Sequence, residues 1–320
     1  MKRNLLACSI VILCGLCGVV SCDKPKVSVE PQTMTLRAAI EQPVAYSASP
    51  AMFGDSEYGV QQRTIIQDGT IPHQIVWQAN DQIIIHFNTG VQGSMRIFDL
   101  TSGAGTGSAE FEYTGFGYTS DPDVTMQEEL PEEYDSILAG YPAMFVTVTP
   151  ENTITVLEAP REIYMGLENV VDYPMYGEAD KDGDISFVCP FGMICFPVAG
   201  DVTINKIAID TSYSNDEIDN DIEISGLFQI NNLGGNEYST TFHSSTHNAN
   251  QIVWSGTSSV TLTDTPVEFY GIMPAGEYGA GVEFQFTTTD GTTITKTTQQ
   301  PFTVTRAQIL NLPVLNVSSN

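Results

Sequence analysis

Short segments in which apolar and polar residues alternate recur along the chain, and they limit it to an all-β fold. In "AEFEYTG" (109–115), Phe111 and Tyr113 share one face of the predicted strand and glutamates take the other. Similar segments are "NTITVLE" (152–158), "VEFQFTTT" (282–289) and "PFTVTR" (301–306). Glycine, asparagine, aspartate and proline separate these segments, which is typical of antiparallel β-sandwiches.

Helical periodicity is scarce in this sequence. The best helical candidate is "MQEELPEEYDSIL" (126–138), where Pro131 limits a helix to a turn or two. The glycine-rich "SGAGTGSAE" (102–110) lies between two predicted strands with no helix after it. We therefore expect a hairpin there and no phosphate-binding loop.

The first 22 residues have the layout of a bacterial lipoprotein signal. Lys2 and Arg3 precede an apolar run, and Val19-Val20-Ser21-Cys22 resembles a lipobox. In this interpretation residues 1–21 are removed and Cys22 is acylated, which would hold the protein at a membrane surface through lipid. The alternative is an ordinary signal peptide with a chance cysteine.

The charge of the chain excludes nucleic acid as a partner. The net charge is −27, and removal of residues 1–21 takes away two basic residues and no acid, which leaves about −29. Phosphate binding needs clustered lysine and arginine, which such a surface lacks. Strong net charge instead favours a soluble exported protein.

The length of the chain suits two sandwiches. About 300 residues remain after signal removal, which is too many for one simple sandwich. The predicted organisation is a signal peptide (1–21), a lipidated tether (22–34), an N-terminal β-sandwich (35–165), a linker or crossover (166–184) and a C-terminal β-sandwich (185–320).

Two cysteines remain in the predicted domains, in "FVCPFGMICFPV". A continuous strand would hold Cys189 and Cys195 about 20 Å apart, too far for a disulfide. A turn at residues 190–192 would bring them together. We favour two buried free thiols over a disulfide.

Asp180, Asp182 and Asp184 surround Gly183 and form the sharpest polar cluster. They are a weak candidate for calcium, because the bidentate glutamate and the flanking helices of an EF-hand are missing. An acidic hairpin or linker is the preferred interpretation, and we expect no metal and no cofactor. No group of acid, base and nucleophile emerges either, so we expect no enzyme. Trp77 and Trp254, each after an apolar pair, are expected to pack in the core and not to stack on sugars.

Several segments, taken in order, resemble the fimbrillin-like family, the lipoprotein pilins of type V fimbriae. After the lipobox come "TMTLRAAIE" (34–42), "RTIIQDGTIPHQIVWQANDQIIIHF" (63–87) and "ILAGYP" (137–142). The second half contains "YPMYG" (173–177), "ISFVCPFGMICFPVAGDVTINKIAI" (185–209) and "FTVTRAQILNLPVL" (302–315). The resemblance covers nearly the whole mature chain and depends on the order of the segments.

The resemblance implies two transthyretin-like β-sandwich domains, no enzyme activity, and a subunit of an adhesive fimbria (pilus) at the cell surface. It implies that an arginine-specific protease removes the N-terminal segment with its first strand, and that the vacated groove accepts a donor strand from another pilin subunit. Arg37-Ala38 is the first candidate for the cleavage site and Arg63 the second. In anchor subunits neither would be cut, and stalk, anchor and tip all stay open.

The alternative function is a surface glycan-binding lipoprotein for nutrient capture, which an exposed row of Tyr113, Phe116 and Tyr118 would favour. We expect Tyr113 to face the core and the other two aromatics to lie in a loop. A host protein or glycan is a further candidate ligand. "DSI" (135–137) resembles a short O-glycosylation sequence with Ser136 as the acceptor, and is a weak candidate.

Overall fold

The structure is a computed structural model whose described residues are almost entirely β. The described residues are 33–53, 75–89, 95–118, 125–127, 129–142, 144–148, 153–165, 173–181, 183–212, 222–234, 237–245 and 249–319. The described residues belong to one compact unit, Gln32–Asn320. The one helical element among the described residues is a 3-10 turn, η1 (Pro50–Phe53).

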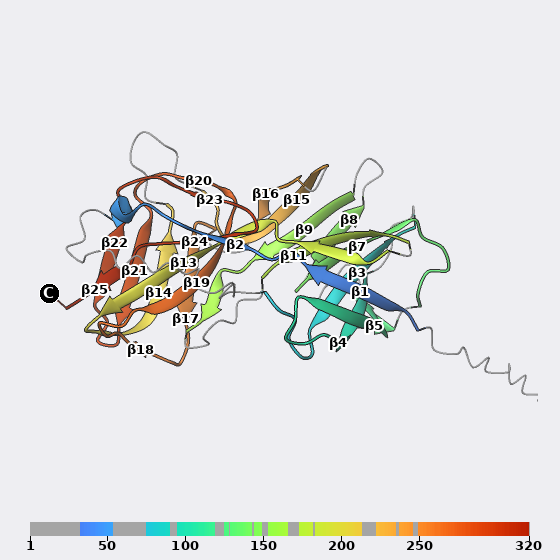
Figure 1. Ribbon diagram of the computed structural model, residues 1–320, viewed down its shortest axis with the longest axis horizontal. Helices are drawn as coiled ribbons and strands as arrows, with labels where there is room; N and C mark the ends of the chain where they lie inside the picture. Colours follow the sequence, from blue (N-terminus) through green and yellow to red (C-terminus); the bar gives the residue numbers. More distant parts are fainter. Residues whose placement is uncertain are drawn as a thin grey trace, which may run out of the picture. The chain divides into compact units, whose positions relative to one another are not determined.

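The largest sheet has eight strands, and β1, β3, β4, β5, β7 and β11 of this sheet are labelled in Figure 1. Its order is β1 (Thr35–Ile40), β12 (Ile185–Val188), β11 (Met175–Asp180), β7 (Ser136–Tyr141), β3 (Gln82–Asn88), β4 (Met95–Ser102), β5 (Ser108–Tyr118) and β6 (Thr125–Gln127). β1 also pairs with β5, so all of these strands except β6 form a closed ring. We call these seven strands the strand ring.

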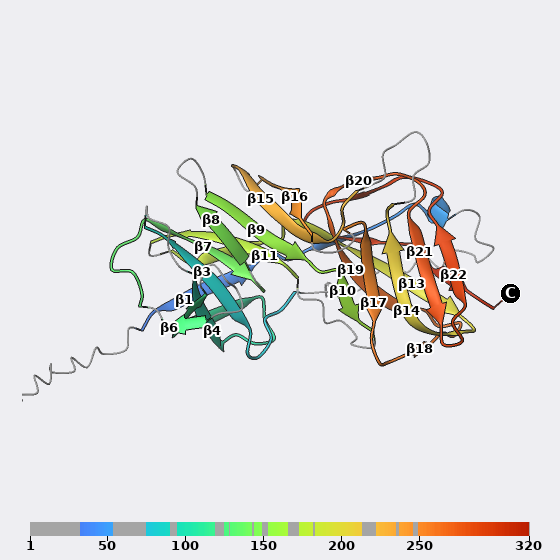
Figure 2. The same cartoon turned by 180° about the vertical axis from the view of Figure 1, so that it is seen from behind.

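Four further sheets complete the described fold. A six-stranded sheet joins β10 (Glu162–Tyr164), β17 (Gln251–Ser255), β14 (Thr203–Asp210), β21 (Glu283–Thr288) and β22 (Thr293–Thr297), with β18 (Val260–Thr261) on β14 (Figure 2). A five-stranded sheet joins β19 (Val267–Pro274), β13 (Phe191–Gly200), β24 (Gln308–Asn311) and β2 (Val44–Ser47), with β25 (Leu315–Val317) on β13. The smaller sheets are β16 (Glu237–Ser244), β15 (Gly226–Gly234), β9 (Thr153–Ala159) and β8 (Met144–Val148), and the pair β20 (Gly276–Tyr278) and β23 (Phe302–Val304).

β13 separates two hydrophobic cores, which explains its unbroken apolar sequence. Met193 and Cys195 pack in the first core, with side chains of the strand ring. Ile194 and Phe196 pack in the second core, with side chains of the six-stranded sheet. Because successive side chains of a strand point to opposite faces, a strand buried on both faces is apolar throughout.

Most of the predicted strands are confirmed. "AEFEYTG" lies in β5 with Phe111 buried, and "VEFQFTTT" forms β21 with Phe284 and Phe286 buried. Phe302 and Val304 are buried in β23, and "SGAGTGSAE" contains the turn between β4 and β5. In that turn Gly103 has φ +93, and a Cβ there would lie 2.2 Å from the Ser108 carbonyl oxygen, so the hairpin requires glycine.

Two local predictions are wrong. The helical candidate at 126–138 instead contributes to β6 and β7, because its apolar residues pair with neighbouring strands and Pro131 breaks the helix. Phe116 and Tyr118, expected in a loop, lie in β5, which continues past Gly115. Gly115 has φ +85 and lies where the pairing of β5 with β4 shifts register, so an irregularity at this glycine lets the strand continue.

The two-domain division at 165 and 185 stays a prediction. Several pairings cross these limits: β9 pairs with β15, and β2 pairs with β24. Within the predicted linker 166–184, β11 pairs with β7 and β12 as part of the strand ring. The limits of the individual sheets therefore do not coincide with the predicted boundaries.

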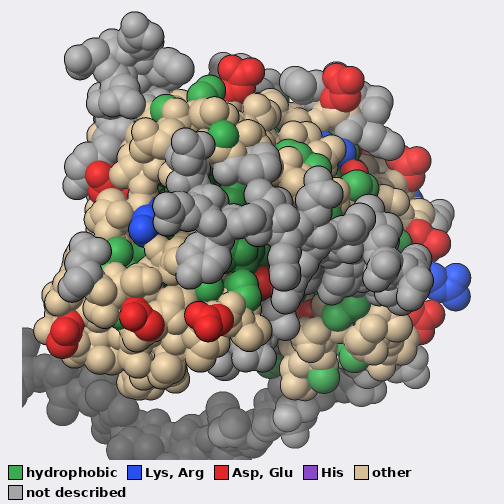
Figure 3. Space-filling view, turned by 60° about the vertical axis from the view of Figure 1, so that its left-hand side comes forward, with side chains coloured by type: hydrophobic (Ala, Val, Ile, Leu, Met, Phe, Trp, Pro, Cys, Tyr) green, Lys and Arg blue, Asp and Glu red, His purple; other side chains and the backbone are tan. Residues whose placement is uncertain are grey.

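Acidic side chains are spread over the face seen in Figure 3, with few basic ones. This distribution agrees with the strongly negative net charge of the sequence.

Within the described part of the chain, no helix combines the length and apolar character needed to cross a bilayer.

Candidate functional site

β1 is held between two strands that come from distant parts of the chain. It pairs in parallel with β12, where Ala38 lies opposite Ile185, and antiparallel with β5, where Ala38 lies opposite Ala109. At its end, the Ile40 amide donates to the Gly107 carbonyl at 2.8 Å. Removing β1 would therefore leave a groove with an exposed strand edge on both sides.

One face of β1 fills the first core and the other faces solvent. Leu36, Ala38 and Ile40 are buried members of the first core. Between them, Arg37 carries an exposed side chain whose Nε lies 3.3 Å from Glu110 Oε1, and the Arg37 side chain is 70% exposed. Alternation thus fixes the register of the strand through three inward side chains.

Glu41 follows β1 directly and binds the C-terminal part of the chain. Its carboxylate accepts two hydrogen bonds from Arg306, with Nη1 at 2.7 Å and Nη2 at 3.0 Å. The amide of Cys189 donates to the same carboxylate at 3.2 Å. The hydrogen bonds from Arg306 to Glu41 raise the pKa of Arg306, so this guanidinium stays charged.

The next residues carry the chain to the second core. β2 pairs in parallel with β24, with Tyr46 opposite Leu310. Met52 in η1 is 1% exposed, and the neighbouring Phe53 packs edge-on against Phe284 with ring centroids 5.4 Å apart. Residues 33–53, which we call the N-terminal segment, therefore contribute to both cores.

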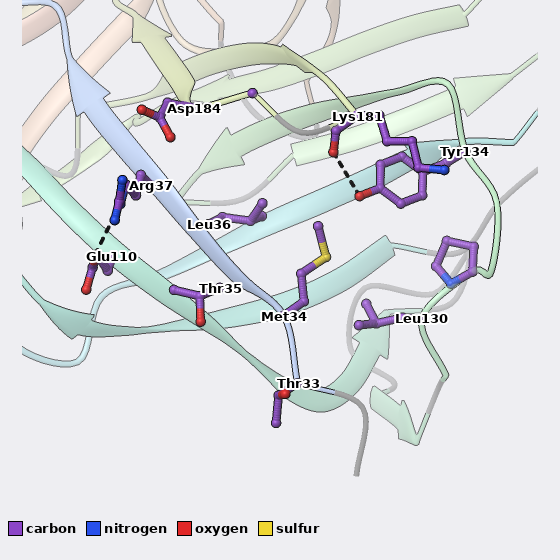
Figure 4. A pocket seen from close by; sticks show the side chains of 12 residues that line it. Thr33, Met34, Thr35, Leu36, Arg37, Glu110, Leu130, Tyr134, Lys181 and Asp184 are labelled. Atoms are coloured by element: carbon purple, nitrogen blue, oxygen red, sulfur yellow. Dashed lines mark hydrogen bonds and ion pairs between the residues drawn. The ribbon is translucent and has the colours of Figure 1, made fainter. Parts of the chain in front are cut away.

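A cavity of about 700 Å³ borders the beginning of β1 (Figure 4). Residues 33–37 form one side, and Leu130, Tyr134 and Lys181 lie on the other. The Tyr134 hydroxyl donates to the Lys181 carbonyl at 3.0 Å, and Arg37 points toward Glu110. The first half of β1 thus lines this cavity.

The predicted site residues are not gathered in one place. Arg37 and Ala38 lie in the middle of β1, whereas Cys22 and Arg63 lie outside the described residues. Ser136 begins β7, and its hydroxyl lies 3.4 Å from the Asn88 side-chain nitrogen.

The two described aspartates of the cluster, Asp180 and Asp184, lie at the turn between the paired strands β11 and β12, as the hairpin interpretation predicted. Asp180 and Asp184 are exposed, and Asp182 lies outside the described residues. The Gly183 amide closes the turn by donating to the Asp180 carbonyl at 3.0 Å. Among the residues that the structure describes, no three His, Cys, Asp or Glu side chains are grouped to hold a metal ion.

Both tryptophans lie in the cores, as predicted. Trp77 is 1% exposed in the first core and Trp254 is 2% exposed in the second. Tyr113 is partly buried against Phe98, at 5.5 Å between ring centroids, while Phe116 is exposed. Tyr113 therefore faces the core as expected, and of the two described side chains of the predicted aromatic row only Phe116 is exposed.

Cys189 and Cys195 are buried free thiols, which confirms the preferred prediction. Both belong to the first core, and burial raises the pKa of each thiol.

The C-terminal strands β24 and β25 both pair in parallel with β13 of the same chain.

His86 predicts a pH-dependent stability. It is 3% exposed in β3, and its pKa is lowered by burial and by the nearby Arg96. In the unfolded chain this histidine accepts a proton near its ordinary pKa of 6.5, whereas in the folded protein it does so only at lower pH. The contribution of His86 to stability is therefore fully present above pH 6.5 and is lost as the pH falls below it.

Urea unfolding at pH 7.5 and 5.5 measures this effect. We expect the loss of stability between these pH values to shrink in His86→Gln and to be unchanged in His243→Gln, whose histidine is exposed on β16. An equal loss in wild type and His86→Gln would contradict the assignment to His86.

Comparison with known proteins gives only remote similarities. No known protein family matches the sequence, and no curated protein matches it. A provisionally assigned cell adhesion protein from Bacteroides ovatus ATCC 8483 has 11% identity and a TM-score of 0.44, over 90% of this chain and 92% of that chain. Another, from Bacteroides uniformis ATCC 8492, has 12% identity and a TM-score of 0.42, over 90% and 93%.

The tip fimbrial protein Mfa3 from Porphyromonas gingivalis, with C-terminal truncation, has 8% identity and a TM-score of 0.27, over 87% of this chain and 94% of that chain. All three similarities lie below 25% identity and below a TM-score of 0.5. They do not establish a family or a function for this chain.

Proposed function

We propose that this chain is a structural subunit of an adhesive surface fimbria, and that β1 is a placeholder strand which a strand of another subunit replaces during assembly. The observation that supports this most strongly is the position of β1, which closes the strand ring between β12 and β5. An extended strand from another subunit would regain the main-chain hydrogen bonds on both sides and fill the positions of Leu36, Ala38 and Ile40.

Cleavage would make the replacement irreversible. A cut after Arg37 would remove Leu36 from the first core and leave Ala38, Ile40 and Glu41 attached to the chain, so these residues would also have to leave their places before an incoming strand could occupy the whole groove. A cut after Arg63 would separate the whole N-terminal segment from the rest of the chain. Because proteases bind their substrates as extended chains, a cut at Arg37 requires β1 to leave its ladders first. The cavity beside residues 33–37 is where such a release would begin.

Before cleavage, the protein would be an outer-membrane lipoprotein anchored through acylated Cys22. Its partners would be other pilin subunits, and the assembled fimbria would bind a host protein or glycan. The lipobox in the sequence and the acidic surface support export to the cell surface.

The mature N-terminus of the native surface protein tests this proposal, by intact mass and terminal sequencing. We expect an N-terminus at Ala38 or Thr64 for a processed subunit that exchanges strands. A lipidated Cys22 in every molecule would restrict the role to an anchor, because the placeholder strand would then stay in place. An unlipidated N-terminus elsewhere in residues 22–34 would contradict both lipid anchoring and strand release.

A further inference from the structure

Glu41 lies where the N-terminal segment passes from the first core to the second. It follows Ile40, the last buried residue of β1, and its amide donates to the Phe187 carbonyl at 2.8 Å. Its side chain is 33% exposed, and that of Arg306 is 21% exposed. The ion pair is thus half-buried, unlike the exposed pair of Arg37 and Glu110 on the same segment.

The two groups that donate to this carboxylate come from outside the N-terminal segment, and so does the Tyr238 ring, which lies against Arg306. Arg306 precedes β24, Cys189 lies between β12 and β13, and Tyr238 belongs to β16. Arg306 Nη1 also donates to the Cys189 carbonyl at 3.1 Å, and the guanidinium carbon lies 5.7 Å from the centre of the Tyr238 ring. We call Arg306, the Cys189 amide and Tyr238 the carboxylate pocket.

The carboxylate pocket is held in place by contacts that do not involve Glu41. The planar guanidinium of Arg306 offers two parallel N–H donors. This geometry fits the two oxygens of a carboxylate better than it fits any neutral side chain. Arginine cannot lose its proton, so an occupant without a carboxylate leaves these donors less well satisfied in a partly desolvated place.

We propose that the carboxylate pocket selects the strand that replaces β1. The strand it accepts belongs to another subunit and carries three alternating apolar residues followed at once by aspartate or glutamate. This inference rests on the proposed function, and it specifies the partner: the apolar residues fill the groove, and the acid fixes register and identity.

The C-terminal strands of a second copy of this chain do not fit this description. Residues 307–320 contain no aspartate or glutamate. Both strands within them, β24 and β25, are already paired with β13. The carboxylate pocket therefore favours a different subunit over these strands of an identical one.

Peptide exchange into a cut but otherwise full-length protein tests the inference. A recognition sequence for a specific protease is placed between residues 54 and 74, and cleavage leaves the N-terminal segment bound by its noncovalent contacts. Labelled peptides are then added and their incorporation is followed by fluorescence anisotropy. The peptides are residues 33–53 as in wild type, the same with Glu41→Gln, the same with Arg37→Gln, and residues 303–320.

The wild-type and Arg37→Gln peptides are expected to bind alike, because an exposed ion pair contributes little. The Glu41→Gln peptide is expected to bind about tenfold or more weakly. Residues 303–320 are expected not to compete. In an Arg306→Glu protein the preference should reverse, with a Glu41→Lys peptide binding better than the wild-type peptide. If that variant does not fold, the comparison of the wild-type and Glu41→Gln peptides in the wild-type protein is the test.

Equal binding of the wild-type and Glu41→Gln peptides, or tight binding of residues 303–320, would overturn the inference and leave strand replacement intact. If the wild-type peptide itself does not enter the cut protein, strand replacement fails and the inference fails with it.

Discussion

Replacing Trp77 by alanine is expected to lower the free energy of unfolding by about 3–5 kcal/mol, the usual cost of truncating a large buried aromatic side chain. Trp77 packs edge-on against Phe111, Tyr141 and Phe187, with ring centroids 4.9, 5.4 and 5.4 Å away. Phe111 belongs to β5 and Phe187 to β12, the two strands that flank β1. The cavity left by the indole would therefore weaken the groove as well as the first core.

Equilibrium unfolding in urea measures this loss, and Phe116→Ala is the matched control. Phe116 is 50% exposed on β5, and its truncation is expected to change stability by no more than about 0.5 kcal/mol. If Trp77→Ala left stability unchanged and abolished binding on a glycan array, the sugar-stacking interpretation would replace the core assignment.

The sequence predicts strands well where one face is buried. In β5, β21 and β23, buried residues alternate with partly or fully exposed ones, so their local period is enough to identify them. It does not identify their partners. β1 pairs in parallel with β12, which lies far along the chain, and no local pattern distinguishes that pairing from a hairpin.

The carboxylate pocket was missed for a related reason. Glu41 and Arg306 are 265 residues apart, and each looks like an ordinary surface charge in its local sequence. The one feature of the sequence that sets these two charges apart is their position. Each lies immediately beside an alternating apolar segment, in "AAIEQ" and "TVTRAQ". Without a map of strand pairing, nothing in the sequence brings these two charges together.

An aspartate at position 38 is expected to release β1 from the strand ring, whereas an aspartate at position 39 is not. Ala38 is 3% exposed and points into the first core, and Ala39 is exposed on the other face of the same strand. A buried, unpaired carboxylate costs about 3 kcal/mol or more, and detachment of β1 would return it to water.

Cleavage by an arginine-specific protease reports this release, because Arg37 lies next to the substituted position. We expect rapid cutting after Arg37 in Ala38→Asp, and cutting in Ala39→Asp as slow as in wild type. The two variants add the same side chain to the same strand one residue apart, so charge and strand propensity are matched and only the direction of the side chain differs. Equal protection of both would mean that the inward face of β1 does not hold the strand in its groove, and the placeholder role would lose its structural basis.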